Sequence, residues 1–461
     1  MKHHSTADLA RRAFLKRSAL LGVAGSAAPW AMNLSLMGDA AAASVPTDYK
    51  ALVCVFLYGG NDYGNTLIPF DDSHYASYAN IRQGLALPQP DLAATALTSP
   101  TPLPDGLQYA LAPGLAPVKP LFDAGKLAVQ LNVGPLVQPT TLAQYNARSV
   151  PLPPKLFSHN DQQSTWQSDQ PEGAKTGWGG RVGDLMLSGN GGTVFTCISV
   201  TGNAVYLSGQ SAVQYQLSTN GAVAVSGISR TLFGSATAQA ALRTLITPTR
   251  AHLFEDEYTR ITRRSIDAEA QVSAALSTLP ALRTPFDSSN SLASQLKMVA
   301  RMIDARSVLG PTRQVFMVSL SGFDLHSGLV DAHPQLMAKV ADALKSFYDA
   351  TVELGVADKV TTFTASDFGR TLSSNGNGSD HGWGSHHLVV GGAVAGGRFY
   401  GTAPAVAVNG PDDVGQGRLL PSTSVDQYGA TLASWFGVSD SNLPLVVPNI
   451  GQFSKRNLGF V

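Results

Sequence analysis

The hydrophobic pattern of this chain consists of continuous apolar runs separated by stretches with helical periodicity. Residues 51–58 read ALVCVFLY and are followed by glycine, asparagine and aspartate. Runs of this kind are typical of central strands that are buried on both faces. Similar runs, each ending in glycine or polar residues, predict four further strands, at residues 126–133, 193–200, 314–320 and 359–364.

Two of the intervening stretches carry apolar stripes at helical spacing. One stripe contains Leu292, Leu296, Val299 and Ile303, and the other contains Leu336, Val340, Leu344 and Tyr348. Strands that alternate with amphipathic helices favour a mostly parallel sheet covered by helices on its faces. The chain is therefore predicted to have an α/β fold with a mostly parallel central sheet flanked by helices.

Other segments depart from this alternation. Residues 97–117 and 137–154 are rich in proline and are expected to be long surface connections. Short alternating strands with Gly and Ser turns are expected at 204–225, and residues 238–282 have helical composition. We therefore expect an inserted cap region at residues 193–310, beside the main sheet.

The N-terminal segment has the composition of an export signal. Arg11 and Arg12 are followed by a weakly apolar run and then by alanines near residues 40–43. A basic head, a modest apolar core and a small-residue exit are the parts of a secretory signal, and the arginine pair selects the twin-arginine route. A basic amphipathic helix or a permanent anchor is the alternative, but polar residues and a proline interrupt the apolar run.

This signal predicts that residues 1–43 are removed and that residues 44–461 form the mature α/β domain, which is periplasmic or secreted. The twin-arginine translocase is then a partner during export, and no stable membrane anchor is expected. Residues 1–43 carry five basic and two acidic side chains in a chain with 32 of each, so the mature protein is slightly acidic. No polybasic run remains to favour nucleic acid as a partner, whereas small polar substrates stay possible.

The two cysteines do not indicate a reactive or metal-binding site. Cys54 and Cys197 both lie inside apolar, strand-like runs, and 44% of all residues are apolar, as is ordinary for a globular protein. We interpret both thiols as small buried hydrophobic groups. A disulfide in an oxidising compartment is the alternative, since the sequence does not show whether the two strands are neighbours.

The densest cluster of candidate chemistry lies at residues 364–387, which read TASDFGRTLSSNGNGSDHGWGSHH. Asp367, Asp380 and three histidines offer carboxylate oxygen and imidazole nitrogen to a divalent cation, and five glycines allow the backbone to bend closely around it. We take His381 and His386 as candidate ligands. Two adjacent histidines cannot easily face one ion, so at most one of His386 and His387 is expected to bind.

Further candidates follow the predicted strands. Asp62 follows the first strand, Asp324 and His326 follow the strand at 314–320, and Asp367 follows the strand at 359–364. In open α/β sheets, ligands bind beyond the carboxyl ends of the strands, where these side chains would meet. The alternatives are an Asx turn at Asp62, a structural Asp-x-His pair, and a plain ion pair between Asp367 and Arg370.

Several motifs together resemble a family of twin-arginine-exported bacterial proteins called domain of unknown function 1501. The shared motifs cover nearly the whole mature chain and read GGND, SHNDQQSTWQS, GFDLH, SDFGR, DHGWGSHHLVVGGAVAGGRFYG, SVDQYGATLASWFGVS and PNIGQF. That family is in turn distantly similar to alkaline phosphatases and sulfatases, which hydrolyse phosphate or sulfate esters with metal ions. The resemblance implies an alkaline-phosphatase-like fold.

The wider resemblance also implies roles for particular residues. Asp62 would be a ligand from the first strand, Asp324 and His326 would hold one ion, Asp367 would hold another, and His381 would be a late ligand. This chain departs from the wider pattern at one place, where Phe368 follows Asp367 instead of histidine. A phenyl ring cannot bind a metal, so either another histidine supplies that ligand or the second ion is weakly bound or absent.

The nucleophile of related enzymes lies at a helix N-terminus, where free amides favour an anion. Ser158 is the candidate here, with an ordinary N-cap serine as the alternative and Thr66 as the weaker candidate. Arg370 would bind an anionic oxygen of the substrate. Zinc fits the His/Asp set best, as one or two ions, with manganese or calcium as alternatives.

These predictions add up to an exported, metal-dependent hydrolase of a small phosphate or sulfate ester. The alternative is a non-catalytic envelope binding or assembly protein that retains the fold and a structural ion, and Phe368 is its best support.

Overall fold

The computed structural model describes residues 48–190 and 194–461. The predicted export signal at residues 1–43 lies outside the described residues and stays a prediction.

The centre of the fold is a buried strand with parallel neighbours on both sides. β1 (Lys50–Tyr58) pairs in parallel with β8 (Arg313–Ser321) and with β9 (Val360–Ser366), and almost every residue of the three strands is buried. The predictions at 51–58, 314–320 and 359–364 are thus confirmed, as is the α/β fold with a mostly parallel central sheet. The complete strand order is β11-β4-β10-β9-β1-β8-β5-β6-β7, with β12 beside β4.

One strand of the sheet was missed because of its histidines. β10 (Ser385–Gly391) lies between β9 and β4 (Leu127–Gly134) and is antiparallel to both. Its sequence, SHHLVVG, begins in a glycine-rich segment that we interpreted as a ligand loop. Successive side chains of a strand point to opposite faces, which sends His386 and His387 to different sides of the sheet.

The remaining strands are short. β5 (Cys197–Ser199) pairs with β8 and β6 (Tyr215–Ser218) pairs with β5, both in parallel, and the chain then turns into β7 (Gly221–Ala222). β11 (Phe399–Tyr400) and β12 (Thr423–Ser424) pair in parallel with β4. Cys54 and Cys197 are both buried and unbridged, as the apolar runs predicted.

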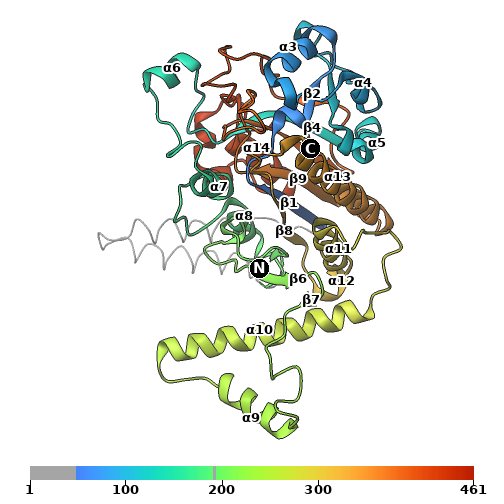
Figure 1. The fold of residues 1–461 in the computed structure, drawn as a ribbon. Helices are drawn as coiled ribbons and strands as arrows, with labels where there is room; N and C mark the ends of the chain where they lie inside the picture. The colour runs from blue at the N-terminus through green and yellow to red at the C-terminus, as the bar shows by residue number, and fades with distance from the viewer. Residues whose placement is uncertain (1–47, 191–193) are drawn as a thin grey trace, which may run out of the picture. The chain divides into compact units, whose positions relative to one another are not determined.

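Helices cover both faces of this sheet (Figure 1). α11 (Ser291–Asp304) and α13 (Leu329–Glu353) pack on one face, and α7 (His159–Ser168), α8 (Trp178–Met186) and α14 (Val425–Phe436) pack on the other. The apolar stripes at 292–303 and 336–348 are confirmed as the buried sides of α11 and α13, apart from the half-buried Leu336 and Tyr348. The other helices are α3 (Asp72–Arg82), α4 (Gln89–Leu92), α5 (Lys119–Asp123), α6 (Leu142–Ala147), α9 (Ala236–Ile246), α10 (Leu253–Thr278), α12 (Arg306–Leu309) and α15 (Leu443–Val446).

The structure changes one expectation about the connecting regions and adds detail to another. Residues 97–117 are not only a surface connection, because β3 (Tyr109–Leu111) is fully buried and pairs with β2 (Leu67–Pro69). Residues 194–310 contribute β5, β6 and β7 to the sheet and α11 to a helical layer. Among residues 194–310, α9 buries no side chain, whereas α10 contributes Ala268 and Val272 to the main hydrophobic core, and a capping role for residues 193–310 stays a prediction.

Candidate metal centre

The candidate site lies at the carboxyl ends of β1, β8 and β9, where three loops come together. The chain leaves β1 through Gly59, whose φ is +115°, and a Cβ there would lie 2.3 Å from the backbone nitrogen of Asp324. Glycine is needed because only a residue without a side chain allows the β1 and β8 loops to approach so closely. The parallel pairing of the strands therefore brings Asp324 and its neighbours together from distant parts of the sequence.

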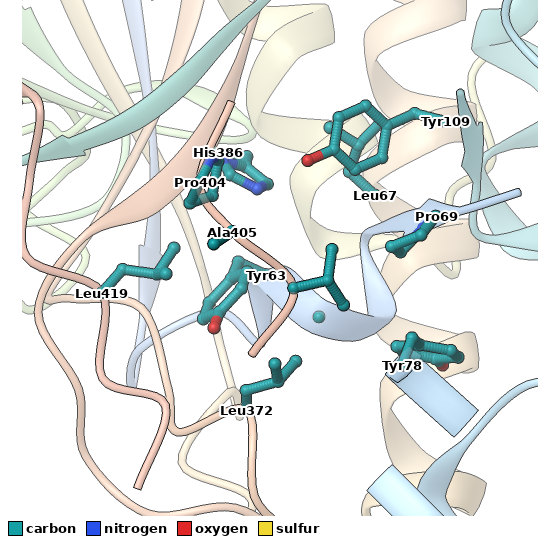
Figure 2. A pocket seen from close by; sticks show the side chains of 12 residues that line it. Tyr63, Leu67, Pro69, Tyr78, Tyr109, Leu372, His386, Pro404, Ala405 and Leu419 are labelled. Carbon is teal, nitrogen blue, oxygen red and sulfur yellow. The ribbon is translucent and has the colours of Figure 1, made fainter. Parts of the chain in front are cut away.

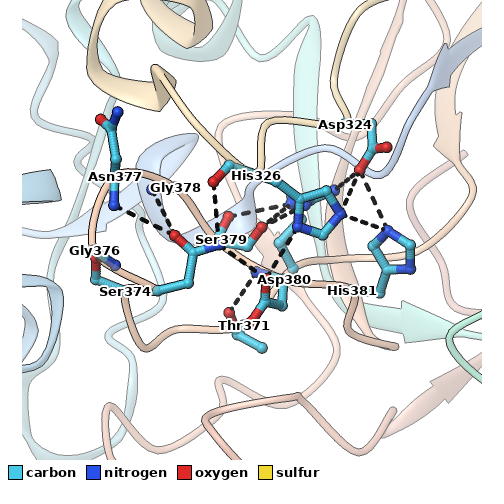
Figure 3. Close-up of polar contacts among 12 residues, drawn as sticks. Asp324, His326, Thr371, Ser374, Gly376, Asn377, Gly378, Ser379, Asp380 and His381 are labelled. Carbon is cyan, nitrogen blue, oxygen red and sulfur yellow. Dashed lines mark hydrogen bonds and ion pairs between the residues drawn. The ribbon is translucent and has the colours of Figure 1, made fainter.

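Three imidazole rings and one carboxylate converge in this place, and Figure 3 shows the part of the cluster built from Asp324, His326 and His381. The Nε2 atom of His381 lies 2.9 Å from Nε2 of His326 and 3.0 Å from Nε2 of His159. Asp324 reaches all three rings, with carboxylate oxygens 3.1 Å from His326 Nε2, 3.3 Å from His381 Nε2 and 3.4 Å from His159 Nε2.

The other nitrogen of each ring donates to an oxygen. His159 Nδ1 lies 2.6 Å from a carboxylate oxygen of Asp367, His326 Nδ1 lies 3.0 Å from that of Asp380, and His381 Nδ1 lies 2.8 Å from the carbonyl oxygen of Phe157. Each Nδ1 faces an oxygen that can only accept, so each Nδ1 carries a proton, and the Nε2 atoms of His159 and His326 both face Nε2 of His381. This is the outer hydrogen-bond pattern of metal-binding histidines.

Two Nε2 lone pairs that face each other repel unless a proton or a cation lies between them. One proton could lie between the Nε2 atoms of His159 and His381. The same proton could not also lie between the Nε2 atoms of His381 and His326. A tetrahedral ion with bonds of about 2.0–2.1 Å separates its ligand atoms by about 3.3 Å, and the ligand atoms of His159, Asp324 and His381 all lie within 4.8 Å of one another. His159, Asp324 and His381 could therefore hold a divalent cation, and His326 lies beside them with its Nε2 against His381 and Asp324.

The charges around the cluster favour an anionic Asp324. Partial burial would raise its pKa, but the hydrogen bond and positive charge of Arg370 outweigh burial and hold the pKa below its usual value. The hydrogen bond to Asp367 raises the pKa of His159, whereas burial lowers the pKa of His381. Since Asp324 and His326 keep 45% and 46% of their side chains exposed, the cluster is open to small molecules.

Asp62 lies behind this cluster and has other partners. Both of its carboxylate oxygens accept hydrogen bonds from Arg82 Nη2, at 3.0 and 2.9 Å, and one also accepts from Ser379 Oγ at 2.7 Å. Arg82 and Asp62 are almost completely buried. The guanidinium thus supplies the cation that we expected a metal to supply, and the structure does not support the prediction that Asp62 is a ligand.

Asp367 and Asp380 occupy supporting positions instead of facing the Nε2 atoms. One oxygen of Asp367 accepts from both His159 and Gln163, while its other oxygen is buried with no partner among the described residues. Asp380 accepts from His326 and from Asn375 Nδ2. Each carboxylate therefore orients a ring, which differs from the direct ligand roles that the sequence predicted.

His386 is not brought to the cluster. Its Nδ1 accepts a hydrogen bond from the backbone nitrogen of Asn132, and its ring lies edge-on to Tyr63 and Tyr109, at 5.3 and 6.2 Å. Figure 2 shows it lining a small, mostly apolar pocket together with Tyr63, Tyr109 and Leu419. Burial lowers the pKa of His386 to about 3, so the ring is neutral in this packing.

The predicted catalytic residues have different surroundings. Ser158 is the N-cap of α7 and directly precedes His159, and its hydroxyl donates to Asp161 at 2.9 Å. Thr66 is buried, and its hydroxyl donates to the backbone oxygen of Asp62. Arg370 is fully buried, with hydrogen bonds to Asp324, to the Gly59 carbonyl and to Ser379, so it orients Asp324 and has no exposed surface for a substrate.

Sequence reasoning missed His159. It stands in the quoted motif SHNDQQSTWQS, at the first position of α7, directly after the serine that drew our attention. The packing of its ring and the ring of His381 against Phe368, each with a centroid distance of 4.8 Å, was also not foreseen. Phe368 therefore contributes an apolar wall where the wider resemblance has a ligand.

Comparison with known families gives a clear assignment. The model of the family described as "Protein of unknown function (DUF1501)" matches residues 49–442. The chain belongs to the DUF1501 family. No curated protein matches this DUF1501 chain.

Several solved structures are distantly similar to this DUF1501 protein. Ps i-CgsB in complex with k-i-k-neocarrahexaose has 10% identity and a TM-score of 0.36, covering 89% of this chain and 77% of that chain. The lipoteichoic acid synthase LtaP from Listeria monocytogenes has 8% identity and a TM-score of 0.32, covering 92% of this chain and 79% of that chain. The C-terminal periplasmic domain of EcEptC from Escherichia coli has 11% identity and a TM-score of 0.32, covering 88% of this chain and 88% of that chain. At TM-scores this low, we draw no conclusion about substrate or mechanism from these likenesses.

One finding bears on the membrane. Across residues 48–190 and 194–461, no helix combines the length and the apolar character that a membrane span requires.

Proposed function

We propose that this protein is an exported, metal-dependent hydrolase of phosphate or sulfate esters. The observation that carries the proposal is the convergence of Asp324 and three imidazole rings at the carboxyl edge of the sheet, where the Nδ1 atom of each ring donates to an oxygen outside the cluster. His159, His326, His381 and Asp324 would hold the ion. Such an ion, zinc by its donor set, would supply a Lewis acid that neutralises an anionic ester oxygen and lowers the pKa of an attacking group.

The protein's own residues would prepare this reaction. Arg370 holds Asp324 in place through a hydrogen bond of 2.8 Å, and Asp367 fixes the orientation of His159. Because Arg370 is fully buried, the half-buried Arg418 is a better candidate to contact an anionic oxygen. Its Nε donates to the backbone oxygen of His381 at 2.7 Å, which places its charge beside the cluster.

Ser158 is the proposed nucleophile. Its hydroxyl proton already points at the carboxylate of Asp161, which can accept it as the oxygen attacks. The serine also lies at the N-terminus of α7, where free amide groups stabilise negative charge. Ser158→Ala separates this role from simple capping, because a cap affects stability whereas a nucleophile affects turnover.

The test combines metal analysis with a substrate screen. The purified chain is loaded with zinc, and phosphate and sulfate mono- and diesters are screened with and without a chelator. We expect one ion per chain and turnover of at least one ester class that the chelator abolishes. His159→Ala should lose both, whereas His252→Ala, an exposed histidine outside the cluster, should keep both. Turnover that survives complete metal removal would refute the proposal.

A second candidate is a non-catalytic envelope binding or assembly protein that keeps the ion for structure. Two observations favour it: Phe368 stands where a ligand was expected, and Arg82 neutralises Asp62 without a metal. Stoichiometric zinc with no turnover of any ester, together with a lower melting temperature after metal removal, would support this candidate over the hydrolase.

A further inference from the structure

The long helix α10 carries one apolar seam, of which only half is covered. Seam positions recur at alternating intervals of four and three residues, which is the spacing of a coiled-coil helix. They are the apolar residues Phe254, Tyr258, Ile261, Ala268, Val272 and Ala275, with Ser265 as a polar member, while Thr259 and Ile266 are buried on a neighbouring face. In the C-terminal half, Ala268, Val272 and Ala275 are 3%, 0% and 1% exposed. In the N-terminal half, Phe254, Tyr258 and Ile261 are 77%, 67% and 44% exposed.

The neighbouring helix α9 does not cover the exposed half. α9 contacts α10 through an ion pair of 4.0 Å between Arg243 and Asp267. Thr247, which directly follows α9, accepts hydrogen bonds from Arg263 of α10 with its backbone oxygen. Figure 1 shows α9 on the side of α10 that faces away from the sheet. Asp267 and Arg263 both lie on the opposite side of α10 from the seam. Within the described part of the chain, Phe254, Tyr258 and Ile261 thus form an exposed continuation of a packed surface.

The charges beside the seam indicate what fits it. Glu257, which forms an ion pair of 2.6 Å with Arg260 within the helix, and Arg264 each stand one position before a seam residue and therefore lie on the same edge of the helix. When two copies of α10 lie antiparallel with Tyr258 of each facing Ile261 of the other, Glu257 of each copy comes opposite Arg264 of the other. The seam is therefore complementary in charge to itself.

The same charges argue against a lipid surface. Glu255, Asp256 and Glu257 directly follow Phe254, so an anionic membrane would repel the end of the helix where the seam is most exposed. A second copy of the chain instead matches both the apolar and the charged positions.

We propose that the protein forms a symmetric dimer in which the N-terminal halves of two α10 helices pack antiparallel. Tyr258 and Ile261 form the inner layers, Phe254 and Ser265 form the outer layers, and two Glu257–Arg264 pairs, related by the symmetry, flank one edge of the interface. This dimer does not depend on the proposed catalytic activity.

Sedimentation equilibrium on the full chain tests the proposal. The wild-type protein should dimerise, and the double variant Tyr258→Ser, Ile261→Ser should raise the dimer dissociation constant at least tenfold, because it removes the inner layers. Val352→Ser changes a residue of α13 that is 53% exposed and should leave the dissociation constant unchanged. Circular dichroism confirms that each variant is folded. A wild-type monomer at every concentration, or a folded double variant that dimerises normally, would overturn the proposal.

A charge exchange tests the antiparallel register. Glu257→Arg and Arg264→Glu, each alone, place like charges opposite one another in both symmetry-related pairs and should weaken self-association several-fold. An equimolar mixture of these two variants restores opposite charges in both pairs and should form heterodimers with near wild-type affinity. If the mixture associates no better than either variant alone, the proposed register is wrong.

Discussion

Changing Asp367 to asparagine tests whether the buried carboxylate behind His159 supports a bound ion. The carboxylate is fully buried and accepts hydrogen bonds from His159 Nδ1 at 2.6 Å and from Gln163 Nε2 at 2.7 Å. Asparagine keeps the shape and can still accept from His159, but it removes the negative charge that makes the ring a better donor to a metal. Loss of such an outer partner typically weakens metal binding about 10–100-fold, which equals about 1.4–2.7 kcal/mol.

Asp380→Asn is the matched control for this experiment. Asp380 plays the same part for His326, at 3.0 Å, but its side chain is 37% exposed. Solvent screens an exposed charge, so this substitution should weaken binding only about threefold. Zinc affinity is measured by competition with a chromophoric chelator, and the melting temperature of each metal-free variant reports any loss of stability. The reasoning fails if Asp367→Asn binds zinc as tightly as the wild type, or if Asp380→Asn binds zinc more weakly than Asp367→Asn does.

Further predictions concern stability and export. Burial lowers the pKa of His387 to about 3, so between pH 6.5 and 3 the unfolded chain binds a proton that the native chain does not. The free energy of unfolding therefore decreases as the pH is lowered through this range, by up to about 1.4 kcal/mol per pH unit. His387→Leu should therefore flatten the pH dependence of the urea midpoint over this range, unlike His252→Leu. Arg82→Ala leaves a buried, unpaired Asp62 and should cost about 3–5 kcal/mol in urea unfolding; a change in zinc stoichiometry would instead indicate that Asp62 is a ligand. Changing the arginine pair of the export signal to lysines should retain the precursor in the cytoplasm, and an unchanged periplasmic yield would count against that route.

The parts of this protein that could be predicted from its sequence depend on short-range patterns. The strands around Asp324 and Asp367 are continuous apolar runs, and their ends are marked by polar residues. The topology of a parallel sheet then brings those ends to one edge. This is why Asp324, His326 and His381 were found as candidates and do lie together.

The residues that sequence reasoning misplaced depend on partners far along the chain. The partner of Asp62 is Arg82, which belongs to α3, and no local pattern marks that arginine as buried. His386 follows a glycine-rich stretch, yet it belongs to a strand because β10 pairs with β4. The backbone nitrogen of Asn132 in β4 also donates to the ring of His386. His159 begins a polar helix, and only the fold places it beside His381.

Anomalous scattering at the zinc edge, from crystals of the zinc-loaded protein, locates any bound ion. We expect one strong peak per chain, within about 2.0–2.2 Å of Nε2 of His159, His326 and His381 and of an Asp324 oxygen. Absence of a peak at full loading, or a peak held by other residues, would contradict the proposed centre.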